Sequence, residues 1–194
     1  MRTLRLFFVC LCVAISIGKA DLIPSLIGTS PAGPNTTWSY SIDVPAGYTA
    51  QPGDFFTIYD FGSIVPSSNS QPINWTFSMS FTGIDPAMVN APDNPSILNL
   101  TWTYTGPPID GSSPDALGIG PFQVTTKSST VANSFFAAQG TLAIGPDAGS
   151  KGENVGQVLG PAVPEPSSFL LIIAFGTVGL INRFLRRQWN FDAI

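Results

Sequence analysis

The chain has 194 residues, a formal net charge of −4 and only 10% charged side chains, against about 25% in an ordinary soluble domain. Glycine (19) and proline (18) are abundant, and histidine is absent. This composition excludes a coiled coil, a bundle of long helices, and any catalytic or metal site that depends on an imidazole.

The N-terminus has the three parts of a secretory signal peptide. Two arginines precede the 12-residue apolar run Leu6–Ile17, and small residues follow it. This run is shorter than the about 20 residues that span a bilayer, so a cleaved signal is favoured over an N-terminal anchor. We therefore assign residues 1–20 to a signal peptide that is cleaved between Ala20 and Asp21. Both cysteines of the chain lie in this segment, so the mature chain has no thiol chemistry.

Residues 21–145 are assigned to the exported domain, in which large apolar residues alternate with small polar ones. The clearest segments are 38–44, 74–81 and 97–105, and such alternation is typical of half-buried strands. Weaker strand signals cover 54–61, 122–126, 131–137 and 141–144. Turn clusters rich in proline, glycine, asparagine and aspartate separate these segments. The sequence therefore predicts an all-β domain, an antiparallel β-sandwich of about seven strands.

The aromatic residues of this domain could form its core or stack on a carbohydrate. Five of them fall on the apolar faces of predicted strands: Trp38, Tyr40, Trp75, Trp102 and Tyr104. This placement favours core packing over ligand stacking. Tyr48 and Tyr59 are less constrained by the pattern. The sequons at Asn74 and Asn99 fall on the polar faces of predicted strands, which is compatible with glycosylation, although chance also explains them in a threonine-rich sheet.

Chemistry-bearing side chains are few in this domain. Residues 21–162 contain only two lysines, Lys127 and Lys151, and no motif places a serine at a fixed spacing from either. Most aspartates flank proline or glycine, where a carboxylate usually accepts hydrogen bonds from its own turn. The oxygen-rich loop 85–94 offers a calcium site as an alternative, without EF-hand spacing. We predict no catalytic residue, no metal and no cofactor. Ten acidic residues against two lysines in residues 21–162 also argue against nucleic-acid binding.

Residues 146–163 are rich in glycine, proline and valine and carry few apolar side chains to bury, so we assign them to a linker. The tripeptide Pro164-Glu165-Pro166 follows directly. Its prolines fix φ near about −65° and favour an extended backbone, which a protease cleft binds more readily than a helix. By itself this tripeptide is equally typical of a proline-rich spacer.

A second apolar run, Phe169–Ile181, predicts a transmembrane helix over residues 167–185. A buried core helix is the alternative, since the 13 apolar residues alone are shorter than the about 30 Å hydrocarbon core. The basic cluster that follows the run consists of Arg183, Arg186 and Arg187. Such a cluster retains one end of a membrane helix on the cytoplasmic side, which favours the transmembrane interpretation. Residues 188–194 would then form a cytoplasmic tail.

A signal peptide, a Pro-Glu-Pro motif, an apolar helix and an arginine cluster occur here in fixed order. This arrangement resembles the PEP-CTERM family of exported bacterial proteins, whose C-terminal signal is processed by the membrane protease-transpeptidase exosortase. The resemblance covers residues 164–187 and implies that Pro164, Glu165 and Pro166 are recognised by the enzyme. It also implies that the helix and the arginines form a stop-transfer and retention signal that is lost on processing. The tail after the arginines departs from the family pattern.

We therefore expect an exported bacterial surface or extracellular-matrix protein with a structural or interaction role and no catalysis of its own. The expected partners are an exosortase-type enzyme and the membrane, with an extracellular polysaccharide as a further candidate. The expected location is a membrane-anchored precursor, followed by the envelope surface or the extracellular space. Two alternatives stay open: a carbohydrate-binding module delivered in the same way, and an unprocessed single-pass membrane protein.

Overall fold

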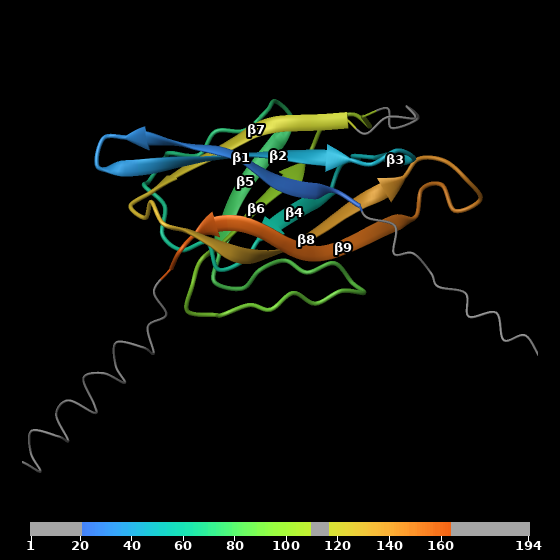
Figure 1. Cartoon of the computed structure of the whole chain (residues 1–194). Helices are drawn as coiled ribbons and strands as arrows, with labels where there is room; N and C mark the ends of the chain where they lie inside the picture. The colour runs from blue at the N-terminus through green and yellow to red at the C-terminus, as the bar shows by residue number, and fades with distance from the viewer. Residues whose placement is uncertain (1–20, 110–116, 164–194) are drawn as a thin grey trace, which may run out of the picture.

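The computed structural model describes residues 21–109 and 117–163, and this part of the chain forms two antiparallel sheets (Figure 1). The smaller sheet has the order β1-β2-β7, from β1 (Ile23–Ala32), β2 (Asn35–Val44) and β7 (Leu117–Thr126). The larger sheet has the order β3-β8-β4-β6-β5, with β9 also paired to β8. Its strands are β3 (Tyr48–Thr49), β4 (Phe55–Ile58), β5 (Trp75–Ser80), β6 (Asn99–Tyr104), β8 (Val131–Leu142) and β9 (Lys151–Pro161).

The core lies between the two sheets and consists largely of aromatic rings. Phe122 of β7 lies with its ring centroid 5.0 Å from those of Phe56 and Trp75 on the larger sheet. Trp102 stacks on Phe56 at 5.0 Å. Such pairs contribute roughly 0.5–1.5 kcal/mol each beyond the area they bury. The all-β antiparallel class predicted from the alternation is confirmed, and the two layers with a shared core are those expected of a β-sandwich.

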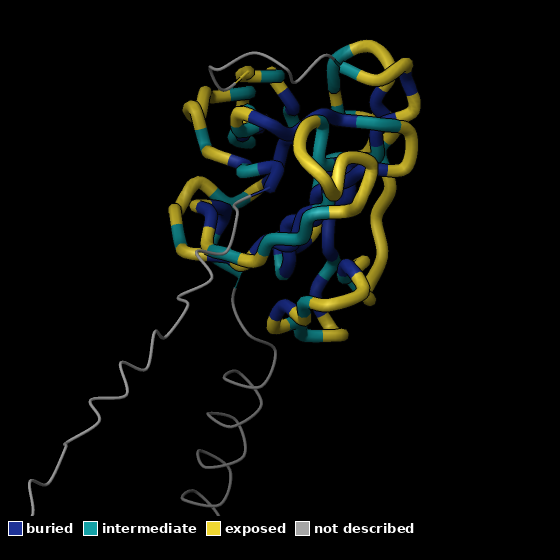
Figure 2. The backbone as a smooth tube through the Cα atoms, turned by 90° about the vertical axis from the view of Figure 1, so that its right-hand side faces the viewer, coloured by how far each residue is buried: buried dark blue, intermediate teal, exposed yellow. Residues whose placement is uncertain are grey.

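The alternating segments of the sequence become β2, β5 and β6, with their large residues turned to the core. The alternation continues towards and past the end of β5, where the large residues are no longer buried: Met79 on β5 is 48% exposed, and Phe81, just after the strand, is 55% exposed. Figure 2 shows the buried segments gathered in the interior of the domain and the exposed ones at its periphery.

The assignment of residues 146–163 to a linker is wrong, because residues 151–161 form β9 and pair with β8 along eleven residues. The glycines that suggest a linker lie on one face of this strand. An added Cβ at Gly156 would lie 2.8 Å from the ring of Phe136, and one at Gly160 3.0 Å from Oγ of Ser134. Side chains of β8 fill the space that these glycines leave. The folded domain therefore extends to Val163 rather than ending near residue 145.

A long loop, residues 81–98, crosses the outer face of the larger sheet (Figure 1, green). Its carbonyl at Ile84 accepts hydrogen bonds from the hydroxyls of Thr57 (3.2 Å) and Tyr59 (2.8 Å) on and after β4. This cover explains why polar residues on the outer face, such as Thr101 and Asn99, are buried.

No helix among the described residues is long and apolar enough to cross a membrane. The transmembrane helix expected over residues 167–185 lies outside the described part of the chain, as do the signal peptide 1–20 and the tail 188–194.

Candidate functional site

Most of the site residues expected from the sequence lie outside the described residues. These are the motif Pro164-Glu165-Pro166, the arginines Arg183, Arg186 and Arg187, and Ala20 on the first side of the expected signal cleavage. The structure describes the residues that adjoin these segments at both ends of the domain. Val163 lies just before the motif, and Asp21 just after the cleavage position.

The chain is fixed to the domain up to the residue before Pro164. After β9, the N–H of Ala162 donates to the carbonyl of Thr130 at 2.7 Å, and the hydroxyl of Ser128 donates to the carbonyl of Ala162 at 3.1 Å. Val163 packs against Gly62, where an added Cβ would lie 2.7 Å from Cγ2 of the valine. Gly62 also has φ of +83°, a conformation that side chains disfavour. Glycine at position 62 therefore allows the positive φ of the turn and leaves the space that the side chain of Val163 occupies.

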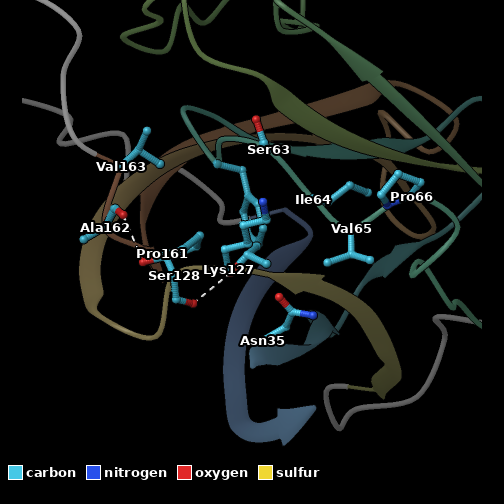
Figure 3. A pocket seen from close by; sticks show the side chains of 12 residues that line it. Asn35, Ser63, Ile64, Val65, Pro66, Lys127, Ser128, Pro161, Ala162 and Val163 are labelled. Atoms are coloured by element: carbon cyan, nitrogen blue, oxygen red, sulfur yellow. Dashed lines mark hydrogen bonds between the residues drawn. The ribbon is translucent and has the colours of Figure 1, made fainter. Parts of the chain in front are cut away.

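A pocket of about 650 Å³ opens beside this exit (Figure 3). Its wall is mainly apolar, with Lys127, Ser128, Ser63 and Asn35 as polar groups. It is lined by Asn35, Phe61, Ser63, Ile64, Val65, Pro66, Thr126, Lys127, Ser128, Pro161, Ala162 and Val163. The pocket therefore brings the ends of β7 and β9 together with the loop that follows β4, next to the last described residue.

Neither lysine of the domain is paired with a serine in the described residues. Ser128 directs its hydroxyl to Ala162 rather than to the adjacent Lys127. Lys151 donates from Nζ to Oδ1 of the buried Asp54 at 2.6 Å and to the hydroxyl of Thr141 at 2.8 Å. The lysine that could act as a base is thus engaged in an ion pair and a hydrogen bond.

The aspartates of the loop 81–98 organise the loop itself. Asp85 accepts hydrogen bonds from the hydroxyl of Tyr59 and the N–H of Ala91. Asp93 accepts from the N–H of Gly83 and the amide of Asn99, both at 2.9 Å. The carboxylate oxygens that would be the ligands of a calcium ion thus accept hydrogen bonds from the protein. The described residues contain no group of three or more His, Cys, Asp or Glu side chains able to hold a metal ion.

The aromatic rings predicted to form the core are at most 5% exposed, which confirms their placement: Trp38, Tyr40, Trp75, Trp102 and Tyr104. Tyr48 and Tyr59, which the pattern leaves unassigned, are buried too. Burial raises the pKa of Tyr59, and its hydrogen bond to Asp85 raises it further. Asn99 lies on the outer face of β6, as expected, but its side chain is buried there: it accepts a hydrogen bond from the N–H of Asp60 and donates one to Asp93.

The comparison with protein families decides what the C-terminal segment is. Residues 162–187 match the family model of the PEP-CTERM protein-sorting motif. The chain carries a PEP-CTERM motif. This motif implies export, a membrane-anchored sorting signal and processing by exosortase. No match was found among the curated proteins or among the solved structures.

The PEP-CTERM match begins inside the folded domain. Its first two residues, Ala162 and Val163, are held by Thr130, Ser128 and Gly62 as described above. The sorting motif therefore follows the last strand with no spacer. Ala162 and Val163 are held by residues from distant parts of the sequence, and the same is true of the pocket beside them. No local sequence pattern could have predicted these contacts.

At the other end of the described residues lies Asp21, whose side chain is fully buried. Its carboxylate accepts hydrogen bonds from the N–H of Leu22, at 2.8 Å, and from the N–H of Gly140. The pKa of Asp21 is raised to about 7, mainly by burial and also by the nearby Asp54, whereas the two N–H donors and Lys151 act in the opposite direction. The sequence singled out Asp21 only as the residue after the cleavage position.

Proposed function

We propose that this protein is an exported bacterial surface or extracellular-matrix protein, in which a β-sandwich domain with a structural or interaction role is delivered by exosortase-type processing. The observation that carries the proposal is the PEP-CTERM motif at residues 162–187, joined directly to β9. The domain is then the part that remains after the sorting signal is removed.

The arrangement of the chain supports display of the domain at a membrane. Strand β9 has 11 residues, and at about 3.3 Å per residue it spans roughly 35 Å. Asp21 contacts the start of this strand through Gly152, and Val163 follows its end. The two ends of the domain therefore lie at opposite ends of β9 (Figure 1). The end next to the sorting motif would face the membrane, and the N-terminal end would face away from it.

A non-catalytic role agrees with the side chains of the described residues. The partly exposed Lys151 of β9 forms an ion pair with the buried Asp54, just before β4, and the loop aspartates accept hydrogen bonds from the loop backbone. The large aromatic rings that could stack on a sugar lie in the core. We therefore propose protein or matrix contacts made by the surface of the sandwich rather than chemistry in a cleft.

The test follows both parts of the precursor in a host that contains an exosortase. An antibody against the domain and an epitope tag placed after Ile194 are used on fractionated cells, and the mature C-terminus is measured by mass spectrometry. We expect the domain to lose the tag in the wild type, and to keep it in a Pro164→Ala, Glu165→Ala, Pro166→Ala variant. Pro31→Ala, an exposed proline on β1, is the matched control and should be processed normally.

The result that contradicts the proposal is a single membrane-bound species that keeps both the domain and the tag in the wild type. That outcome favours the unprocessed single-pass protein instead.

A further inference from the structure

The carboxylate of Asp21 occupies a space that two paired glycines leave open. Gly140 of β8 and Gly152 of β9 face each other across the ladder. An added Cβ at Gly140 would overlap Oδ1 of Asp21, and one at Gly152 would lie 3.0 Å from Oδ2. The same Cβ at Gly152 would lie 2.5 Å from Cε1 of Tyr48. A side chain at either glycine would therefore displace the carboxylate, so this end of the sheet is built around it.

The charges around this carboxylate do not balance. Its titratable neighbours are Asp54 before β4, Lys151 on β9 and Tyr48 on β3. Lys151 lies directly on the carboxylate of Asp54, at 2.6 Å, and that carboxylate also accepts from Thr141. Asp21 has two backbone N–H donors and no cation in direct contact among the described residues. Two buried carboxylates thus share one ammonium group, although a buried charge without a partner is strongly unfavourable.

Removal of the signal peptide creates a cation at this place. While residues 1–20 are attached, the nitrogen of Asp21 is a neutral amide. Hydrolysis of the Ala20–Asp21 bond adds one water, leaves a carboxylate on Ala20, and leaves an α-ammonium on the Cα that carries the buried side chain. No other position in the described chain would gain a positive charge on export.

We propose that the α-ammonium of Asp21 is the missing counter-charge, so that removal of the signal completes an ion cluster with Asp21, Asp54 and Lys151 and stabilises the mature fold. This inference rests on the export that the proposed function includes and on the cleavage between Ala20 and Asp21 expected from the sequence. The mature N-terminus is then a structural part of the domain, and any residue left in front of Asp21 lowers the stability of the fold.

The pH dependence of stability distinguishes the two forms. With an amide at position 21, the raised pKa of about 7 means that the folded state holds a proton that the unfolded carboxyl, near about 3.9, releases. Stability of that form therefore falls as the pH rises from about 4 to 7. The α-ammonium keeps the carboxylate charged and removes this loss. Its own contribution is present below the unfolded amine pKa of about 7.7–8.0 and is lost as the pH rises through its raised folded value.

The experiment compares the exported protein with a variant that has one glycine inserted between Ala20 and Asp21. The small residues that the signal peptidase reads stay in place, so the mature variant begins Gly-Asp. At pH 7 we expect the melting temperature of the variant to be lower by about 3–8 °C, with the difference shrinking towards pH 4.5. The same insertion in an Asp21→Asn background is the matched control and should shift the melting temperature by less than about 1 °C.

A second measurement tests the inference without the asparagine variant, in case that variant does not fold. At pH 7, the α-amine of the wild type should react with an acylating reagent several-fold more slowly than the α-amine of the glycine-extended protein, because a paired ammonium is less available. Mass spectrometry of both proteins gives the first residue. A wild type that begins elsewhere than Asp21 overturns the cleavage and this inference with it. A wild type that begins at Asp21, but melts and reacts like the extended form between pH 5 and 8, overturns this inference and leaves the export proposal intact.

Discussion

The assignment of residues 151–161 to a strand can be tested at Gly156, whose α-carbon faces the ring of Phe136 on β8. The Gly156→Val substitution would place a Cβ 2.8 Å from Cε1 and 3.0 Å from Cζ of that ring. Phe136 is only 4% exposed and packs in the core, so it has little room to move. Overpacking of this kind costs about 1–3 kcal/mol, which lowers the melting temperature of a domain of this size by roughly 3–10 °C.

Thermal and urea unfolding of the exported protein, followed by circular dichroism, measure the effect. Gln157→Val is the matched control, because Gln157 is the exposed neighbour on the same strand, and it should change stability by less than about 0.5 kcal/mol. In the double variant Gly156→Val, Phe136→Ala the clash is relieved, so its loss of stability should be smaller than the sum of the two single losses. If Gly156→Val has no more effect than Gln157→Val, the segment is a linker and the strand assignment fails.

Three further changes test the core, the ion pair and the attachment of the sorting signal. Phe122→Ala removes a fully buried ring that contacts three aromatic residues, and should cost about 3–5 kcal/mol in urea unfolding. Lys151→Met leaves the buried Asp54 without its cation; because the lysine is 39% exposed, we expect a loss of about 1–3 kcal/mol, and an unchanged urea midpoint would contradict the pairing. A six-residue Gly-Ser insertion between Val163 and Pro164 should leave the melting temperature within about 1 °C and speed removal of a C-terminal tag, whereas slower removal would show that the enzyme needs the adjoining surface.

The strands that could be predicted are those whose evidence is local. In β2, β5 and β6 each large residue lies between polar ones, and this alternation predicts which face of the strand is turned to the core. For β9 the evidence lies on another strand, since the ring of Phe136 supplies the bulk that Gly156 lacks. β1 is missed for a different reason. It contains Pro24 and Pro31, which the edge of a sheet tolerates because an edge strand leaves backbone positions unpaired.

Burial of polar residues on the larger sheet also could not be predicted. Asn99 and Thr101 alternate correctly with the core residues of β6, but the loop 81–98 returns over them. The sorting motif, in contrast, is a contiguous pattern and could be recognised directly. The setting of Asp21 could not, because its carboxylate depends on Gly140, 119 residues away, and on the register that places Gly152 opposite that glycine.

The attachment of the sorting signal to β9 has a mechanical consequence for a protein held at a surface by its C-terminus. A pull applied there enters the domain along the axis of β9, which is paired to β8 over eleven residues. The load then acts parallel to the two strands, and the hydrogen bonds between them resist together in shear instead of opening one after another. Tyr40 of the smaller sheet adds a hydrogen bond between the two sheets, because its hydroxyl donates to the carbonyl of Leu159 on β9 at 3.0 Å. We expect this domain to bear tension from its anchored end better than from a point that peels β9 sideways.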